Sequence, residues 1–122
     1  MTLSTLGREE RVHSRTVLVR KLTSSGLVFF TNRESAKGME LAAHPQCAGQ
    51  LLWLDLQRQV RVEGVARQLD DWEADQYFAG RPRPSQIGAW ASPQSTVLRD
   101  RSELEQSVAA NEKRFAEAAE IP

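Results

Sequence analysis

The sequence predicts an α+β fold in which a small antiparallel β-barrel carries inserted and C-terminal helices. Three observations favour this class. Short runs with strand patterning occupy the first half of the chain, tight polar turns separate them, and helical patterns are inserted late. The 122 residues suffice for one domain with a real core, so we expect a single domain over residues 1–122.

Five strands are predicted, and the first three form an antiparallel meander. Polar and apolar residues alternate over Thr2–Leu6, and a charged turn leads into a second strand over Val12–Leu22. A short apolar strand follows at Leu27–Thr31. The last two strands are expected at Cys47–Leu54 and Val60–Leu69, joined by a tight polar segment.

Three helices are predicted between and after these strands. Ser35–Ala43 contains good helix formers and is stopped by Pro45. Asp70, with Glu73 three residues later, has the form of a capped start for a helix that reaches Gly80. The last helix, Ser102–Phe115, opens with a capping box and has a narrow apolar stripe.

Composition argues against several classes of protein. The 16 basic residues balance the 16 acidic ones, so nothing indicates a nucleic acid or a membrane surface as a partner. The single cysteine, Cys47, forms no internal disulfide, and no apolar signal core precedes the first strand, so we expect a cytoplasmic protein. His13 and His44 belong to no recognisable dyad or metal pattern, so neither protein catalytic residues nor a metal site are predicted.

Phosphate would have to be bound by side chains, because the chain has no glycine-rich nucleotide loop. Arg15, Thr31, Ser35 and Lys37 are one candidate group if neighbouring strand ends and the following helix start converge. The alternative is that Arg15 and Lys37 are ordinary surface charges, which spacing alone favours.

The segment Arg81–Ser95 contains a second candidate group. Three prolines stiffen it, and the planar guanidinium groups of Arg81 and Arg83 suit phosphate. The segment is therefore interpreted as a ligand-facing loop, while a solvated turn with no chemical role remains the alternative.

Several motifs resemble those of the pyridoxine/pyridoxamine 5'-phosphate oxidase family. Four short ones are Arg-x-Val-Leu-x-Arg at Arg15–Arg20, Phe-Phe-Thr-Asn at Phe29–Asn32, Ser-Ala-Lys at Ser35–Lys37, and Arg58-Gln59-Val60. The longest is Tyr77-Phe78 followed by Arg-Pro-Arg-Pro-Ser-Gln-Ile-Gly-Ala-Trp-Ala-Ser-Pro-Gln-Ser at Arg81–Ser95. Their order and spacing agree across nearly the whole chain, which implies the FMN-binding split barrel of that family.

The resemblance also implies an activity and a set of binding residues. The activity is FMN-dependent oxidation of pyridoxamine or pyridoxine 5'-phosphate to pyridoxal 5'-phosphate by dioxygen, in a homodimer whose sites lie at the subunit interface. By motif position, the FMN contacts are Arg15, Phe30, Thr31, Lys37, Gln59, Gln94 and Ser95. The substrate contacts are Arg20, Tyr77, Arg81 and Ser85.

The chain departs from the family pattern at three places. Arg20 stands where the family usually has lysine, and Ala36 stands where some members have another basic residue. The sequence ends before the family's Trp-Gly-Gly and Arg-x-His-x-Arg motifs, so we expect an open barrel edge. Two further hypotheses follow: a non-catalytic split-barrel protein that binds FMN or pyridoxal phosphate, and a flavin reductase-like relative that uses another substrate.

Overall fold

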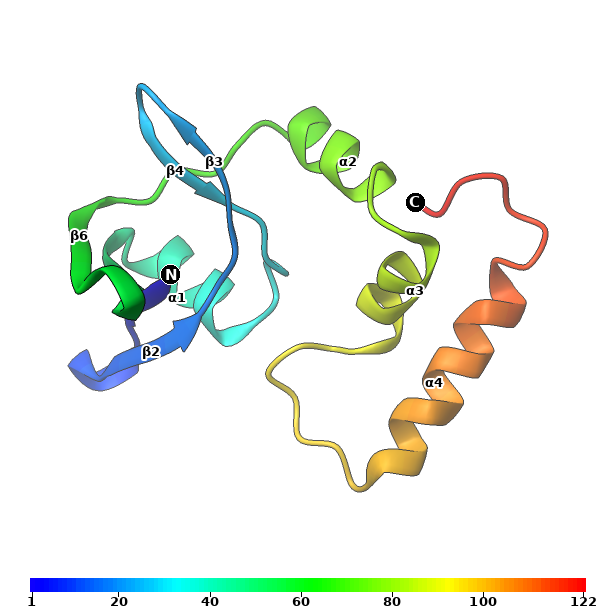
Figure 1. The fold of residues 1–122 in the computed structure, drawn as a ribbon. Coiled ribbons are helices and arrows are strands. Elements are labelled where there is room, and N and C mark those ends of the chain that lie inside the picture. Colours follow the sequence, from blue (N-terminus) through cyan, green and yellow to red (C-terminus); the bar gives the residue numbers. More distant parts are fainter. The chain divides into compact units, whose positions relative to one another are not determined.

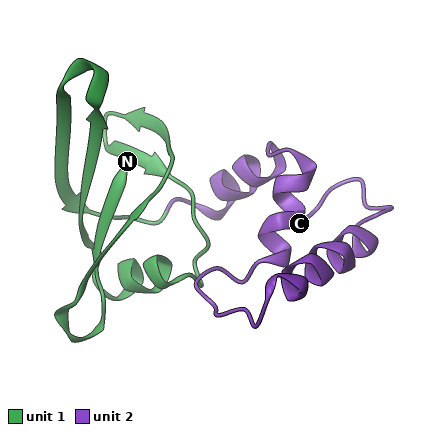
Figure 2. Ribbon diagram, turned by 60° about the horizontal axis from the view of Figure 1, so that its bottom comes forward, with its two compact units in different colours: residues 1–68 green, residues 69–122 purple.

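A computed structural model describes all 122 residues, which divide into two compact units. The first unit is Met1–Gln68 and the second is Leu69–Pro122 (Figure 2). The six strands and helix α1 lie in the first unit, and helices α2, α3 and α4 lie in the second (Figure 1). None of these helices has the length and apolar character needed to span a bilayer. The single domain expected from the chain length remains a prediction.

The first unit contains a four-stranded antiparallel sheet and a separate hairpin. The sheet has the order β2-β1-β5-β6, with bounds Val12–Thr16, Thr2–Leu6, Gln46–Trp53 and Arg58–Val65. The hairpin pairs β3 (Val19–Thr23) with β4 (Gly26–Phe29). Every pairing is antiparallel, as the sequence predicts. The buried Leu3 and Thr5 of β1 lie in the middle of the sheet, between β2 and β5.

The strand predicted over Val12–Leu22 is in fact two strands. The chain leaves the sheet after Thr16, where the buried Val17 donates its backbone N–H to the Met1 carbonyl at 2.9 Å. The N-terminal ammonium in turn donates to the Val17 carbonyl at 3.1 Å. The partner of Val17 is distant in sequence, which explains why strand patterning alone did not indicate the break.

The last two strands also differ from their predicted bounds. A short 3-10 turn, η2 (Leu54–Leu56), joins them and ends at Gln57 in the left-handed region, with φ 49°. Strand β6 then begins at Arg58 and ends at Val65, short of Leu69. The Ala66 N–H still bonds the Pro45 carbonyl at 2.7 Å, but Pro45 has no N–H with which to continue the pairing.

Helix α1 (Ala36–Ala43) confirms the prediction from the sequence. Ser35 is its N-cap, and its hydroxyl accepts a hydrogen bond from the backbone N–H of Gly38. His44 closes the helix immediately before Pro45. The helix packs against β1, which places its first turn beside the sheet.

The second unit is built from helices α2 (Asp71–Ala79), α3 (Arg83–Ala91) and α4 (Arg101–Arg114). Its core is Ile87, Phe115 and Ile121, with Phe78, Val108 and Ala118 packed against them. Asp70 stands at the N-cap of α2, as predicted, but its side chain makes no capping hydrogen bond. The capping box predicted from Ser102 is wrong, because α4 is capped by Asp100, whose carboxylate accepts from the Glu103 N–H at 3.0 Å.

The segment Arg81–Ser95 is mostly helical rather than a stiff loop. Helix α3 occupies its centre, with Pro82 at the N-cap and Pro84 in the first turn. The first turn of a helix has N–H groups without helical partners, so proline costs nothing there and its fixed φ favours the start. The prolines therefore begin a helix, and only the ends of the segment remain irregular.

Candidate functional site

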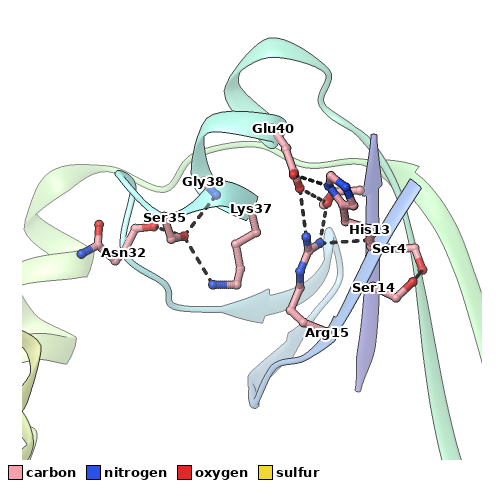
Figure 3. Close-up of polar contacts among 10 residues, drawn as sticks. Ser4, His13, Ser14, Arg15, Asn32, Ser35, Lys37, Gly38 and Glu40 are labelled. Atoms are coloured by element: carbon pink, nitrogen blue, oxygen red, sulfur yellow. Dashed lines mark hydrogen bonds and ion pairs between the residues drawn. The ribbon is translucent and has the colours of Figure 1, made fainter. Parts of the chain in front are cut away.

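A buried lysine and a half-buried arginine form the centre of a polar cluster in the first unit (Figure 3). Lys37 lies in the first turn of α1, and Arg15 lies on β2. Lys37 is only 8% exposed, and its Nζ donates to Ser35 Oγ at 3.3 Å. A lysine this buried needs polar partners to stay charged, so Lys37 is not an ordinary surface charge.

The Ser35 hydroxyl organises the entry to helix α1. It is fully buried, donates to the Asn32 carbonyl at 2.7 Å and accepts from both Lys37 Nζ and the Gly38 N–H. The chain passes so close to Gly38 that a Cβ there would lie 2.3 Å from the Arg33 carbonyl oxygen. Glycine is therefore required at this turn of the cluster.

The guanidinium of Arg15 is held by three neighbours. Its Nη2 donates to Glu40 Oε2 at 3.0 Å, and its Nη1 donates to the His13 carbonyl at 3.2 Å and to the hydroxyl of Thr5. The Thr5 hydroxyl donates to the same Glu40 oxygen at 2.5 Å. The other oxygen of Glu40 lies 2.6 Å from His13 Nδ1. Glu40 thus joins β1, β2 and α1.

The electrostatics of the cluster favour an anion. Burial lowers the pKa of Lys37, the nearby Arg15 lowers it further, and Glu40 acts in the opposite direction. Burial raises the pKa of Glu40, but three side-chain hydrogen bonds outweigh that effect and hold the pKa below its ordinary value of 4.5. Two cations and one carboxylate leave one net positive charge. An ammonium and a guanidinium beside the start of α1 form a donor set that fits phosphate.

The other predicted residues of the first unit lie on separate elements. Phe30 and Thr31 follow β4, where Phe30 is half-buried and Thr31 is exposed. Arg20 is exposed on β3. On β6, Gln59 accepts a hydrogen bond from Gln50 Nε2 at 3.2 Å. Gln59 also borders an open groove of about 560 Å³, lined by Trp53, Leu56, Gln57, Arg58, Gln59 and Val60.

In the second unit, three predicted substrate contacts lie around the α2–α3 turn. Tyr77 is in the last turns of α2, Arg81 is in the connection, and Ser85 is in the first turn of α3. All three are half-buried. The Arg81 guanidinium lies 5.8 Å from the centre of the Phe78 ring, which is within reach of a cation–π contact.

Gln86 holds this turn together and was missed by sequence reasoning. Its side chain is buried, and its Nε2 lies 3.0 Å from each of the carbonyl oxygens of Phe78, Ala79 and Arg81. Glu40 was missed as well, although it lies three residues after Lys37 on the same helix. That spacing puts two side chains on one helix face and was the available signal.

Arg83 does not share the environment of Arg81, with which the sequence grouped it as a phosphate donor. Its guanidinium donates to the carbonyls of Phe115 and Ala118, the latter at 3.1 Å, so it satisfies the C-terminal end of α4. Gln94 and Ser95 lie in an exposed turn. A hydrogen bond from the Thr96 N–H to the Pro93 carbonyl, at 3.2 Å, closes this turn.

Comparison with known proteins identifies close relatives. A family model described as pyridoxamine 5'-phosphate oxidase matches residues 1–114. The pyridoxine/pyridoxamine 5'-phosphate oxidase of Ectopseudomonas mendocina is 50% identical over 119 residues, which cover 98% of this chain and 55% of the relative. The enzyme of that name from Synechocystis is 50% identical over 115 residues, which cover 94% of this chain and 54% of the relative. The chain therefore spans about half the length of the curated relatives it matches.

Solved structures show the same architecture. One is PhzG from Burkholderia lata 383, in complex with tetrahydrophenazine-1-carboxylic acid, with a TM-score of 0.89 and 30% identity. The match covers 99% of this chain and 59% of the PhzG chain. A pyridoxamine 5'-phosphate oxidase-related, FMN-binding protein from Nostoc punctiforme has a TM-score of 0.64 and 18% identity. The match covers 85% of this chain and 59% of that protein's chain. The second likeness concerns the fold alone. Together they confirm the predicted α+β split-barrel class.

Proposed function

The chain belongs to the pyridoxamine 5'-phosphate oxidase family, and from this premise we propose that it binds FMN and oxidises pyridoxamine or pyridoxine 5'-phosphate to pyridoxal 5'-phosphate. FMN supplies the redox chemistry when bound, with dioxygen as the electron acceptor. The observation that supports the proposal best is the buried Lys37 beside Arg15, a site with the charge and donors to hold a phosphate.

The residues of the first unit would bind and orient the flavin. Arg15 and Lys37 neutralise its phosphate, and the hydroxyl of Thr31 and the carboxamide of Gln59 orient the ribityl chain and ring. Phe30 contributes its backbone. The redox step belongs to the flavin when it is bound, so the part of these residues is binding, orientation and charge.

The residues of the second unit would bind the substrate and a second flavin. Tyr77, Arg81 and Ser85 form a phenol, guanidinium and hydroxyl set for the substrate phosphate. The motif resemblance also assigns Arg20 to the substrate. Gln94 and Ser95 contact the flavin held by the partner subunit of a homodimer. The lone Cys47 suits the reducing cytoplasm, which we include in the proposal.

Two substitutions separate the flavin role from the substrate role. Lys37→Ala should weaken FMN binding, and Arg81→Ala should raise the KM for pyridoxamine 5'-phosphate with little effect on FMN. Each loses a charge-assisted contact worth about 1.5 to 3 kcal/mol, or at least tenfold in affinity. Flavin-fluorescence titration and hydrogen peroxide release measure the two effects. Arg61→Ala, an exposed cation on β6, is the matched control.

The outcomes distinguish the proposals. A wild-type chain that fails to bind FMN contradicts the proposed function, and equal losses in both variants contradict the division of roles. FMN binding without peroxide release on any phosphorylated B6 vitamer would identify a non-catalytic flavin-binding protein instead.

The likeness to PhzG favours a second candidate function. That protein carries a ring carboxylic acid in its structure and aligns with 99% of this chain. The alternative is therefore an FMN-dependent oxidation of a ring substrate that has no phosphate. The two candidates are separated by substrate: hydrogen peroxide release on adding pyridoxamine 5'-phosphate supports the first, and release only with a phosphate-free ring carboxylic acid supports the second.

A further inference from the structure

We propose that Glu40 is a positioning residue that fixes the guanidinium of Arg15 for an incoming phosphate. This inference rests on the proposed binding of FMN and concerns the same site. Glu40 Oε2 accepts from Arg15 Nη2 at 3.0 Å (Figure 3). It also accepts from the Thr5 hydroxyl at 2.5 Å, and Thr5 accepts from Arg15 Nη1. The three side chains form a closed ring of hydrogen bonds.

This ring restrains the guanidinium before any ligand arrives. Both of its terminal nitrogens are engaged, and the Thr5 partner is only 2% exposed, so the ring cannot shift by moving into solvent. An arginine side chain otherwise loses considerable rotamer freedom when it binds an anion. Restraint in the free protein removes part of that entropic cost and so strengthens binding.

A carboxylate at this position also lets two cations stay close together. Arg15 and Lys37 repel each other, and Glu40 is the acidic group that favours the charged form of Lys37. Glu40 would repel a phosphate as well, but both of its oxygens are already occupied. One faces Arg15 and Thr5, and the other lies 2.6 Å from the His13 ring. Its charge is therefore largely compensated locally, and we expect the positioning effect to exceed the repulsion.

Two variants separate positioning from simple charge compensation. Glu40→Gln keeps an oxygen that can accept from Arg15 and Thr5 but loses the charge, and Glu40→Ala loses both. Glu63→Ala is the matched control, because Glu63 also pairs with an arginine but lies exposed on β6. Dissociation constants are measured for FMN and for riboflavin, which has the same ring and ribityl chain without the phosphate.

The expected result is a loss confined to the phosphate. Glu40→Ala should weaken FMN binding about tenfold, because the Arg15 guanidinium loses its restraint, and leave riboflavin binding within about twofold. Glu40→Gln should keep FMN affinity within about threefold of the wild type. Equal weakening of both flavins would indicate a structural role and overturn the proposal. Tighter FMN binding in both variants would show that repulsion dominates, which also overturns it.

A second readout does not depend on the flavin. In the nitrogen-15 NMR spectrum of the free chain, hindered rotation should give Arg15 separate signals for its terminal nitrogens, assigned by their loss in Arg15→Lys. These signals should merge in Glu40→Ala, and signals already merged in the wild type overturn the proposal. If the wild-type chain binds FMN and riboflavin with equal affinity, the proposed function is overturned together with this role. If the wild type does distinguish them and Glu40→Ala does so equally well, only the role of Glu40 fails.

Discussion

Ser95 adopts a backbone conformation that favours glycine. Its φ is 68°, in the left-handed region, at the third position of the turn closed by Pro93 and Thr96. A non-glycine residue held there costs about 1 to 3 kcal/mol and persists where the surrounding structure or a function requires it. The hydroxyl of Ser95, which we assign to the flavin, is a reason for retaining serine at a strained position.

Substitutions at Ser95 separate its backbone from its hydroxyl. Ser95→Gly should raise the free energy of unfolding by about 0.4 to 1 kcal/mol, because the strain disappears, and should weaken FMN binding because the hydroxyl is lost. Ser95→Ala should weaken FMN binding to the same degree without the gain in stability. Urea denaturation and flavin titration measure the two quantities. Equal stability of both variants would show that the conformation carries no strain.

Glu40 makes the stability of the first unit depend on pH. Its pKa is lower in the folded chain than its ordinary value of 4.5, so the folded state favours the ionised form. The resulting stabilisation is complete above that value and is lost as the pH falls through the folded-state pKa. We therefore expect the wild type to exceed Glu40→Gln in unfolding free energy at about pH 7 and to lose that advantage progressively as the pH falls below 4.5. An advantage that stays constant in urea denaturation over this range would contradict the assignment.

At the scale of elements, the start of α1 depends on one glycine. A Cβ on Gly38 would lie 2.3 Å from the Arg33 carbonyl oxygen, a backbone atom that cannot move without opening the turn around Ser35. Gly38→Ala should therefore cost about 1 to 3 kcal/mol of stability and weaken FMN binding through Lys37. A Cβ added to Gly88, inside α3, would meet nothing within 4 Å, so Gly88→Ala is the matched control and should stabilise by about 0.5 to 1 kcal/mol. Thermal unfolding of both variants measures the two changes in stability. Similar changes for Gly38→Ala and Gly88→Ala would contradict the prediction.

Elements with local start and stop signals were predictable, and those set by distant contacts were not. Helix α1 was predicted within a residue, because Ser35 caps it and Pro45 follows it directly. The break after β2 was not, since it depends on Met1. Helix α3 was not predicted, because its prolines indicate a loop unless they fall in the first turn of a helix.

The candidate site shows the same limit. Spacing alone favoured surface positions for Arg15 and Lys37, but Lys37 is buried, because α1 packs against β1. The motif spanning Arg81–Ser95 supplied the family without distinguishing the environments of its arginines. Only the fold shows that Arg83 binds the end of α4 through contacts more than thirty residues away in sequence.

At the scale of the whole molecule, the proposed roles require more than one chain. The first unit leaves apolar side chains exposed on its β5–β6 hairpin, among them Leu52, Leu54 and Val60. Single exposed apolar residues are ordinary, but several on one hairpin support association with a second copy. The motif resemblance gives the same answer, because it assigns Gln94 and Ser95 to a flavin held by the partner subunit.

If residues from two chains hold one FMN, binding and dimerisation must be thermodynamically linked. A ligand that binds the dimer more tightly than the monomer stabilises the dimer, and by reciprocity dimerisation raises the affinity for the ligand by the same factor. We therefore expect FMN to lower the dimer dissociation constant in sedimentation equilibrium, and the apparent FMN affinity to rise with protein concentration. Lys37→Ala should abolish the effect of FMN while leaving association of the free chain unchanged, because Lys37, at 8% exposed, offers little surface to a second chain. An FMN affinity that stays constant across protein concentrations spanning the dimer dissociation constant would mean that each chain binds its flavin alone, and would remove Gln94 and Ser95 from the partner's site.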